Sequence, residues 1–227
     1  MKKGLIIAID GPSGAGKSTL SKALAGELGY MNIDTGAMYR SVALLAQRQQ
    51  VDPTDADGLQ AVCKGISISF AEAPGGERVL LNGEDVSGAI RTPEVSLLTA
   101  QIAASPVVRT EMLHLQREMG EAGGVVLEGR DIGTVVFPDA QVKFFLSATA
   151  QERGRRRYDE LREKGTEVDL QQTIAEVEAR DAAGEERAHA PLRRDGDTVA
   201  VDSAAMSIDQ VLQEMLKVVA ERRKALE

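Results

Sequence analysis

Short apolar runs alternate with longer amphipathic stretches along this chain. Four runs, at residues 5–9, 125–128, 142–146 and 198–202, are continuous enough to predict strands that are buried on both faces. Stretches with helical periodicity stand between or after them. Buried strands that alternate with helices are typical of an α/β fold with a doubly wound parallel sheet.

Periodicity and end signals predict the helices. Leu20, Leu24 and Leu28 recur every four residues in a helix that starts at about Lys17, and Gly29 stands where its C-terminal cap belongs. Further helices are expected at 37–49, at 55–64 after the cap Thr54, on either side of Ser105-Pro106 with Ser105 as a cap, at 151–164, at 170–181, and after the capping box Ser207–Gln210.

Residues 66–86 break this pattern. Ile66, Ile68 and Phe70 alternate with serines, and Asn82-Gly83 is a strong signal for a hairpin turn. We therefore expect a small antiparallel region inserted into the α/β core.

Composition narrows the possible functions. Apolar residues make up 43% of the 227 residues, and the net charge is -8. An acidic protein is a poor general binder of nucleic acids or anionic membranes, which require broad basic patches, so an anionic substrate would need a local basic pocket. The one cysteine, Cys63, lies among apolar residues and predicts a buried structural thiol, which fits a reducing cytoplasm. The N-terminal apolar run is too short for a signal peptide, and no run approaches the length of a membrane span.

A glycine-rich segment between the first strand and the first helix predicts a phosphate-binding loop. It fits G-x-x-x-x-G-K-[ST], in which backbone N–H groups and the start of the helix cradle phosphate oxygens. Lys17 can reach the β- and γ-phosphates of ATP, the hydroxyl of Ser18 can ligate Mg²⁺, and Thr19 can bind the α-phosphate. The expected ATP-binding residues are Gly11, Pro12, Ser13, Gly14, Ala15, Gly16, Lys17, Ser18 and Thr19.

This loop predicts nucleotide binding without identifying the reaction. The chain has no N-K-x-D guanine motif, and no apolar strand in a suitable place ends in the Asp-Glu of large ATPases. A phosphoryl-transferring kinase requires a second anion pocket with cationic side chains. Arg130 and Asp131 follow the strand at 125–128, where ligands bind in open α/β sheets. Arginines are concentrated at 153–157, and a mobile segment there could close over the phosphates. No Cys/His cluster has metal-ligand spacing, so His114 and His189 are not expected to bind metal.

Taken together, GPSGAGKST, DTGAMYR, LNGEDVS, IRTPEVS, EGRDIGTVVFPDA and the RD…R…APL segment resemble the bacterial cytidylate kinases, in order, over nearly the whole chain. The resemblance implies a core of five parallel strands at 1–35 and 88–227, with a short helical lid at about 149–168. It also implies an inserted small α+β region at 36–87, with following helices to about 120, that binds the nucleoside monophosphate. The implied reaction converts ATP and CMP or dCMP to ADP and CDP or dCDP with Mg²⁺, as part of pyrimidine nucleotide metabolism.

The resemblance also implies roles for particular residues. Arg40 and Arg130 would hold the acceptor phosphate, Arg109 and Asp131 would read the base, and Arg180 and Arg187 would frame the ribose. Asp34 and Thr35 belong to the same acceptor segment as Arg40. The implied catalytic residues are Lys17, Arg130 and the lid arginines Arg153, Arg156 and Arg157.

Asp131 explains how cytosine would be chosen, because a carboxylate accepts a hydrogen bond from the exocyclic amine and repels the carbonyl of uracil. Two positions depart from the family pattern: Gly184 replaces the second Asp of R-D-x-x-D-x-x-R, and Ala100 replaces a Ser of some members. We expect weaker acceptor binding, or an altered preference between CMP and dCMP, relative to a Gly184→Asp variant. Equal kinetic constants for the two proteins would contradict this expectation.

Two alternatives remain at this stage. The chain could be another P-loop kinase that acts on UMP, AMP or a small metabolite, or a P-loop ATPase or switch that binds nucleic acid through the 153–157 arginines. The preferred prediction is a monomeric, cytoplasmic kinase with ATP and CMP or dCMP as its substrates and no nucleic-acid or membrane partner.

Overall fold

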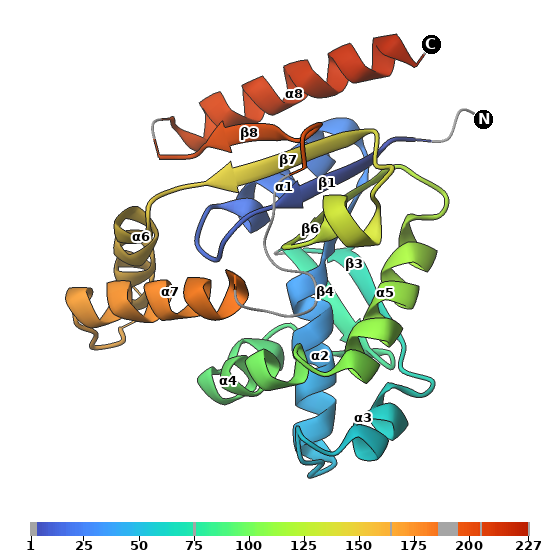
Figure 1. Cartoon of the computed structure of the whole chain (residues 1–227), viewed down its shortest axis with the longest axis vertical. Coiled ribbons are helices and arrows are strands. Elements are labelled where there is room, and N and C mark those ends of the chain that lie inside the picture. The colour runs from blue at the N-terminus through green and yellow to red at the C-terminus, as the bar shows by residue number, and fades with distance from the viewer. Residues whose placement is uncertain (1–3, 75, 164, 186–194, 205, 227) are drawn as a thin grey trace. The chain divides into compact units, whose positions relative to one another are not determined.

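The computed structural model describes residues 4–74, 76–163, 165–185, 195–204 and 206–226, with the side chains of 180–185 excepted. The chain divides into two compact units. The first comprises Met1–Asn32 with Ala122–Glu227, and the second comprises Ile33–Glu121. Figure 1 shows the elements of both units, with labels where there is room.

The first unit is built on a five-stranded sheet with the order β2-β6-β1-β7-β8. Its strands are β1 (Ile6–Asp10), β2 (Met31–Asp34), β6 (Val125–Gly129), β7 (Val142–Ser147) and β8 (Val199–Asp202). β1 pairs in parallel with both β6 and β7, and β7 pairs in parallel with β8. The predicted α/β fold with a five-stranded parallel sheet is confirmed. Because β6 and β7 flank β1, the strand order reverses at β1, where ligands bind in such sheets.

One face of this sheet is covered by α1 (Lys17–Leu28) and α8 (Ile208–Ala225). Their side chains share a buried cluster with those of β1 and β7, among them Ile7, Leu24, Phe144 and Met215. α1 ends at Gly29, whose φ of 64° is the left-handed C-cap that the sequence predicts. α8 opens with the predicted capping box of Ser207 and Gln210.

Two further helices of the first unit, α6 (Ala150–Glu163) and α7 (Leu170–Glu185), pack against each other. They pack closely at Gly154, where a Cβ would lie 2.8 Å from the Cα of Ile174. The five-residue helical turn η2 (Ile132–Val136) follows β6.

The second unit is mainly helical. Its long helix α2 packs with α3, α4, α5 and the short turn η1. A three-stranded antiparallel sheet, β3-β4-β5, turns at Asn82 and Gly83, which both have positive φ as the hairpin prediction requires. The elements are α2 (Thr35–Arg48), α3 (Ala56–Cys63), β3 (Ile68–Ala73), β4 (Gly76–Leu81), β5 (Glu84–Asp85), η1 (Ala89–Arg91), α4 (Pro93–Ile102) and α5 (Pro106–Gly120).

Several local predictions need correction. Thr54 does not cap α3, because its hydroxyl donates to Asp52 (2.6 Å), and Asp55 accepts the N–H of Gly58 instead. Ser105 occupies the N-cap position of α5 but makes no side-chain cap hydrogen bond there. α2 begins at Thr35 rather than at residue 37, because Asp34 caps it. The apolar pattern did not predict β2. Cys63 is buried as expected, and burial raises the pKa of its thiol to about 11.

Candidate functional site

The loop between β1 and α1 requires its glycines. Gly11, Gly14 and Gly16 have φ values of 148°, 80° and 91°, which L side chains rarely adopt. A Cβ on Gly11 would also collide with the carbonyl oxygen of Leu146 in β7. The loop therefore has the backbone conformation that the phosphate-loop motif predicts.

Protein donors engage the carbonyl groups of this loop. The ammonium of Lys17 donates to the carbonyl oxygens of Gly11 and Pro12, both at 2.8 Å. Arg153 donates to Ser13 O (3.0 Å), and the hydroxyl of Ser203 donates to Ala15 O (2.9 Å). With its carbonyls held in this way, the loop can present its N–H groups to an anion.

The start of α1 also suits an anion. Its N-cap, Gly16, makes no side-chain cap hydrogen bond, and the first turn of the helix carries no acidic residue. Helix starts concentrate unsatisfied N–H groups and positive dipole charge, so this arrangement fits phosphate oxygens.

Glu128 is a site residue that the sequence reasoning missed. It lies in β6 opposite Ile9 of β1, and it is buried. Its carboxylate accepts hydrogen bonds from the hydroxyls of Ser18 (2.8 Å) and Ser21 (3.4 Å). The sequence signal that could have identified Glu128 is its position, as an acidic residue at the carboxyl end of the apolar run 125–128.

Ser18 and Glu128 fit Mg²⁺ that arrives with a nucleotide. Mg²⁺ prefers oxygen ligands, keeps several waters, and is commonly bound by one or two protein groups together with substrate phosphates. Among the described residues, no group of three or more His, Cys, Asp or Glu could hold a metal ion alone. The hydroxyl of Ser18, held against the buried carboxylate of Glu128 beside the loop, matches a site in which the protein and the substrate phosphates bind Mg²⁺ together.

Asp10 is a second residue that sequence reasoning missed. It is the last residue of β1 and is 4% exposed. Its two carboxylate oxygens accept hydrogen bonds from the N–H groups of Ile132 and Gly133, each at 2.8 Å. Burial raises the pKa of Asp10 to about 6, since the cost of desolvation exceeds the stabilising effect of these two hydrogen bonds.

Arg130 and Asp131 lie between the end of β6 and η2, and both are half-buried. The next two residues, Ile132 and Gly133, are held by their hydrogen bonds to Asp10. The predicted pair is thus placed at the carboxyl end of a strand beside β1, as the sequence analysis expected.

The predicted lid arginines differ in their surroundings. Arg153 is buried and bonds Ala148 O as well as Ser13 O, while Arg156 donates to Ser203 O at 2.7 Å. Arg157 is exposed and pairs with Glu160 at 2.9 Å. In this structure Arg153 and Arg156 therefore support the backbone around the phosphate loop, and phosphate contact by the three arginines stays a prediction.

A cavity of about 560 Å³ lies at the carboxyl ends of β7 and β8. Ser147, Ala148, Thr149, Glu152, Asp202 and Ala204 line it. Ser203, next to Asp202, is the residue that bonds the loop carbonyl of Ala15. The cavity is therefore adjacent in structure to the phosphate loop and has room for a planar ring system.

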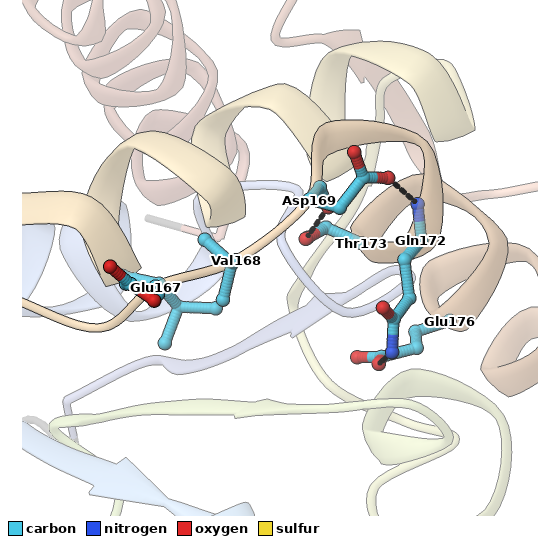
Figure 2. Close-up of a pocket in the computed structure, with 7 residues that line it drawn as sticks. Glu167, Val168, Asp169, Gln172, Thr173 and Glu176 are labelled. Atoms are coloured by element: carbon cyan, nitrogen blue, oxygen red, sulfur yellow. Dashed lines mark hydrogen bonds between the residues drawn. The ribbon is translucent and has the colours of Figure 1, made fainter.

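A smaller cavity of about 380 Å³ has the wrong chemistry for an anion. Figure 2 shows its lining side chains at the start of α7, where Asp169 accepts the N–H of Gln172 and the hydroxyl of Thr173 donates to Asp169 O. Glu167, Asp169 and Glu176 line this cavity, and no described lining residue is basic. It does not suit a nucleotide phosphate.

In the second unit, Asp34 and Arg40 form a preassembled pair. Asp34 caps α2 by accepting the N–H of Ala37 (2.8 Å), and its other oxygen accepts from the guanidinium of Arg40 (2.9 Å). Gly36 leaves room for that guanidinium, since a Cβ there would lie 3.2 Å from an Arg40 nitrogen. The buried Nε of Arg40 has no hydrogen-bond partner, which suits an arriving anion.

The other predicted acceptor residues are placed as follows. Thr35 is buried in the first turn of α2, and Arg109 is half-buried on α5. Arg187 and His189 lie outside the described residues. The side chain of Arg180 and the surroundings of Gly184 also fall outside the described part. His114 is exposed on α5.

Comparison with known proteins gives a consistent result. The family model described as Cytidylate kinase matches residues 7–221. The chain is 65% identical to a cytidylate kinase of Syntrophotalea carbinolica over 224 residues, which cover 99% of this chain and 95% of that protein. It is 57% identical to a cytidylate kinase of Geobacter sulfurreducens, with 99% and 96% covered.

Solved structures match in fold. A gluconokinase from Sinorhizobium meliloti aligns with a TM-score of 0.52 at 16% identity, covering 99% of this chain and 95% of that one. A shikimate kinase from Bacteroides thetaiotaomicron aligns with a TM-score of 0.50 at 16% identity, covering 95% and 98%. In the part of the chain that is described, no helix has the length and apolar character to cross a membrane.

Proposed function

The chain belongs to the cytidylate kinase family, and from this premise we propose that it transfers the γ-phosphoryl group of ATP to CMP or dCMP. The products are ADP and CDP or dCDP. The observation that carries the proposal is the family match over residues 7–221, which includes both the phosphate loop and the segment with Arg130 and Asp131.

We assign the triphosphate of ATP to the loop from Gly11 to Thr19. The uncapped start of α1 and the glycine backbone support this assignment. Lys17, which already lies over the loop, would turn its ammonium toward the β- and γ-phosphates. Ser18 and Glu128 would hold Mg²⁺ with those phosphates, and the ion, when bound, would neutralise part of their charge.

We assign the adenine of ATP to the 560 Å³ cavity at the ends of β7 and β8. The support for this assignment is that Ser203 and Arg156 connect the cavity's edge to the phosphate loop. A base placed there would lie at the carboxyl ends of the strands, as does the loop that would hold its phosphates.

For the acceptor, this proposal assigns a role to each of the residues that the resemblance implies. Arg40 would bind the acceptor phosphate, with support from its ion pair to Asp34 and its unsatisfied buried Nε. Arg130 would bind the same phosphate. Asp131 and Arg109 would read the cytosine, and Arg180 and Arg187 would frame the ribose.

The proposed chemistry requires alignment and positive charge rather than a catalytic base. The acceptor phosphate is an anion and can attack directly, so the protein must hold two polyanions in line. Lys17 and Arg130 would stabilise charge as it moves between them. Arg157, an exposed member of the 153–157 cluster, can reorient because its surface ion pair is worth little.

An acceptor panel tests this function. ADP release is measured with ATP, Mg²⁺ and each of CMP, dCMP, UMP, AMP and GMP. We expect CMP and dCMP to give the highest kcat/KM, with UMP lower by at least about 100-fold, because the carboxylate of Asp131 facing the carbonyl of uracil is strongly unfavourable. A best acceptor other than CMP or dCMP would contradict the proposal.

A further inference from the structure

The carboxylate of Asp10 connects two loops that are far apart in sequence. Asp10 directly precedes Gly11, the first residue of the phosphate loop. Its oxygens accept from Ile132 and Gly133, which directly follow Arg130 and Asp131. One side chain thus fixes the backbone of the acceptor-reading segment to the strand that carries the donor loop.

The backbone of this segment is also held close to Asp10 by packing. A Cβ on Gly133 would lie 3.4 Å from Asp10 Oδ2 and 3.1 Å from the side chain of Lys143. Lys143 is itself 6% exposed, and its ammonium pairs with Asp197 at 2.9 Å. The position next to Asp10 therefore suits glycine, and the segment has little room to shift.

The charge of Asp10 is costly for the fold. The group is buried, and its pKa is raised to about 6, chiefly by desolvation; the charge of Asp131 contributes to this rise, and the charge of Lys17 opposes it. A protein that needed only a cap for η2 could use a neutral side chain at lower cost. A costly buried charge retained beside a binding segment is typical of a functional requirement.

We propose that Asp10 is a positioning residue for the acceptor: by holding the N–H groups of Ile132 and Gly133, it fixes the directions of Arg130 and Asp131. The inference rests on the proposed function for its kinetic consequences. Asp10 itself does not contact either nucleotide in this proposal. Its loss should weaken acceptor recognition and leave ATP binding nearly unchanged.

The test compares Asp10→Asn with wild type and with Asp139→Asn, which removes an exposed carboxylate from the loop after η2. Asn is nearly isosteric but can offer only one acceptor oxygen, and its NH₂ group opposes the second N–H. Amide hydrogen exchange at Ile132 and Gly133 should accelerate by about tenfold or more in Asp10→Asn, because a broken bond exposes these amides to local opening. Asp139→Asn should exchange like wild type.

Kinetics provide the second measurement. In Asp10→Asn, kcat/KM for CMP should fall by about 10- to 100-fold and the ratio of CMP to UMP should fall with it, as expected for a small displacement of binding groups. KM for ATP should stay within about twofold. An Asp10→Glu variant, which keeps the carboxylate, should recover part of the CMP preference.

Three results would overturn the proposal: unchanged exchange at both amides, equal losses for CMP and ATP, or an Asp10→Asn protein that is unfolded at pH 7. The last would make Asp10 a structural residue. Failure of the proposed function would look different, because the wild type would then prefer another acceptor while the exchange experiment still reported on Asp10.

Discussion

Two strand-to-helix turns in this protein begin with the same residue type, an aspartate, but the two aspartates bond to different partners. β1 and β2 both end in an aspartate and both run into a helix, α1 or α2. Asp34 caps its own helix through Ala37 and pairs with Arg40. Asp10 leaves α1 uncapped and accepts instead from Ile132 and Gly133, more than a hundred residues away.

In the proposed function, this difference separates two ways of binding phosphate. At α1 the backbone would bind the phosphate, so the helix start must stay open and the adjacent carboxylate must be directed elsewhere. At α2 the helix start is closed by its cap, and a side-chain cation, Arg40, would supply the attraction. The backbone site depends on glycine geometry, while the side-chain site depends on charge pairing.

The largest effect is expected at the backbone site. Lys17→Met should lower kcat/KM by about 10³-fold, because in the proposed function it removes a cation that stabilises the transferring phosphoryl group. Steady-state kinetics with CMP and ATP would measure it. Lys22→Met, an exposed change on the same helix, is the control and should match wild type. A loss below tenfold for Lys17→Met would contradict the assignment of this loop to ATP.

The second effect concerns the pH dependence of stability that arises from the buried carboxylate of Asp10. The pKa of Asp10 rises from its ordinary 3.8 to about 6 in the folded protein, so the native state binds more protons than the unfolded state between these values. The stability contributed by this group is complete below pH 3.8 and is lost as the pH rises through about 6. Asn does not ionise and escapes this loss.

Asp10→Asn should therefore gain stability relative to wild type with rising pH, by up to about 3 kcal/mol above pH 6, at 1.36 kcal/mol per pKa unit. Urea unfolding of both proteins at pH 4, 5, 6 and 7 measures the difference. A difference that does not change with pH would show that the buried carboxylate is not the destabilising group.

The third effect tests the side-chain site. Arg40→Ala should lower kcat/KM for CMP by about 100-fold with little change in KM for ATP, because a charged group is removed and Asp34 is left without this partner. Arg48→Ala is a matched control on α2: Arg48 also pairs with a carboxylate, Glu84 at 2.7 Å, but both are exposed. Equal losses in the two variants would argue against a phosphate role for Arg40.

The smallest effect separates the two roles of Asp34, which caps α2 and pairs with Arg40. Asn can still accept the N–H of Ala37 but cannot hold Arg40 by charge. Asp34→Asn should therefore raise KM for CMP by about tenfold and cost about 1 kcal/mol of stability. Thermal unfolding and CMP titration would check both values. A stability loss with no change in KM would make Asp34 only a helix cap.

The phosphate loop could be predicted from sequence because its determinants are contiguous. The glycines, Lys17 and Ser18 lie within nine residues, and each acts through local backbone geometry. The caps of α1 and α8 were predictable for the same reason. Thr54 was predicted as the cap of α3 because the helix was expected to start at Asp55, and only the structure shows that the Thr54 hydroxyl is bonded to Asp52.

The features that could not be predicted from the sequence depend on contacts between segments that are distant along the chain. β2 has a short, mixed pattern, with Asn32 between Met31 and Ile33, and it is a strand because it joins the edge of the sheet beside β6. Asp10 and Glu128 are single acids at strand ends whose partners lie 122 and 110 residues away. Arg153 and Arg156 were predicted as lid residues from the family resemblance and the density of charge, and neither signal could show that backbone carbonyls hold them.

The close packing of Gly154 against Ile174 has a consequence for spectroscopy. Gly154 of α6 has no side chain of its own and packs directly against the side chain and Cα of Ile174 in α7. The two helices therefore have no space to slide past each other at this point, so a displacement of one on ligand binding is shared by the other. A pair of spin labels with one on each helix would keep a constant separation through the catalytic cycle. A label on α7 paired with one on α8 would instead record the amplitude of any closure.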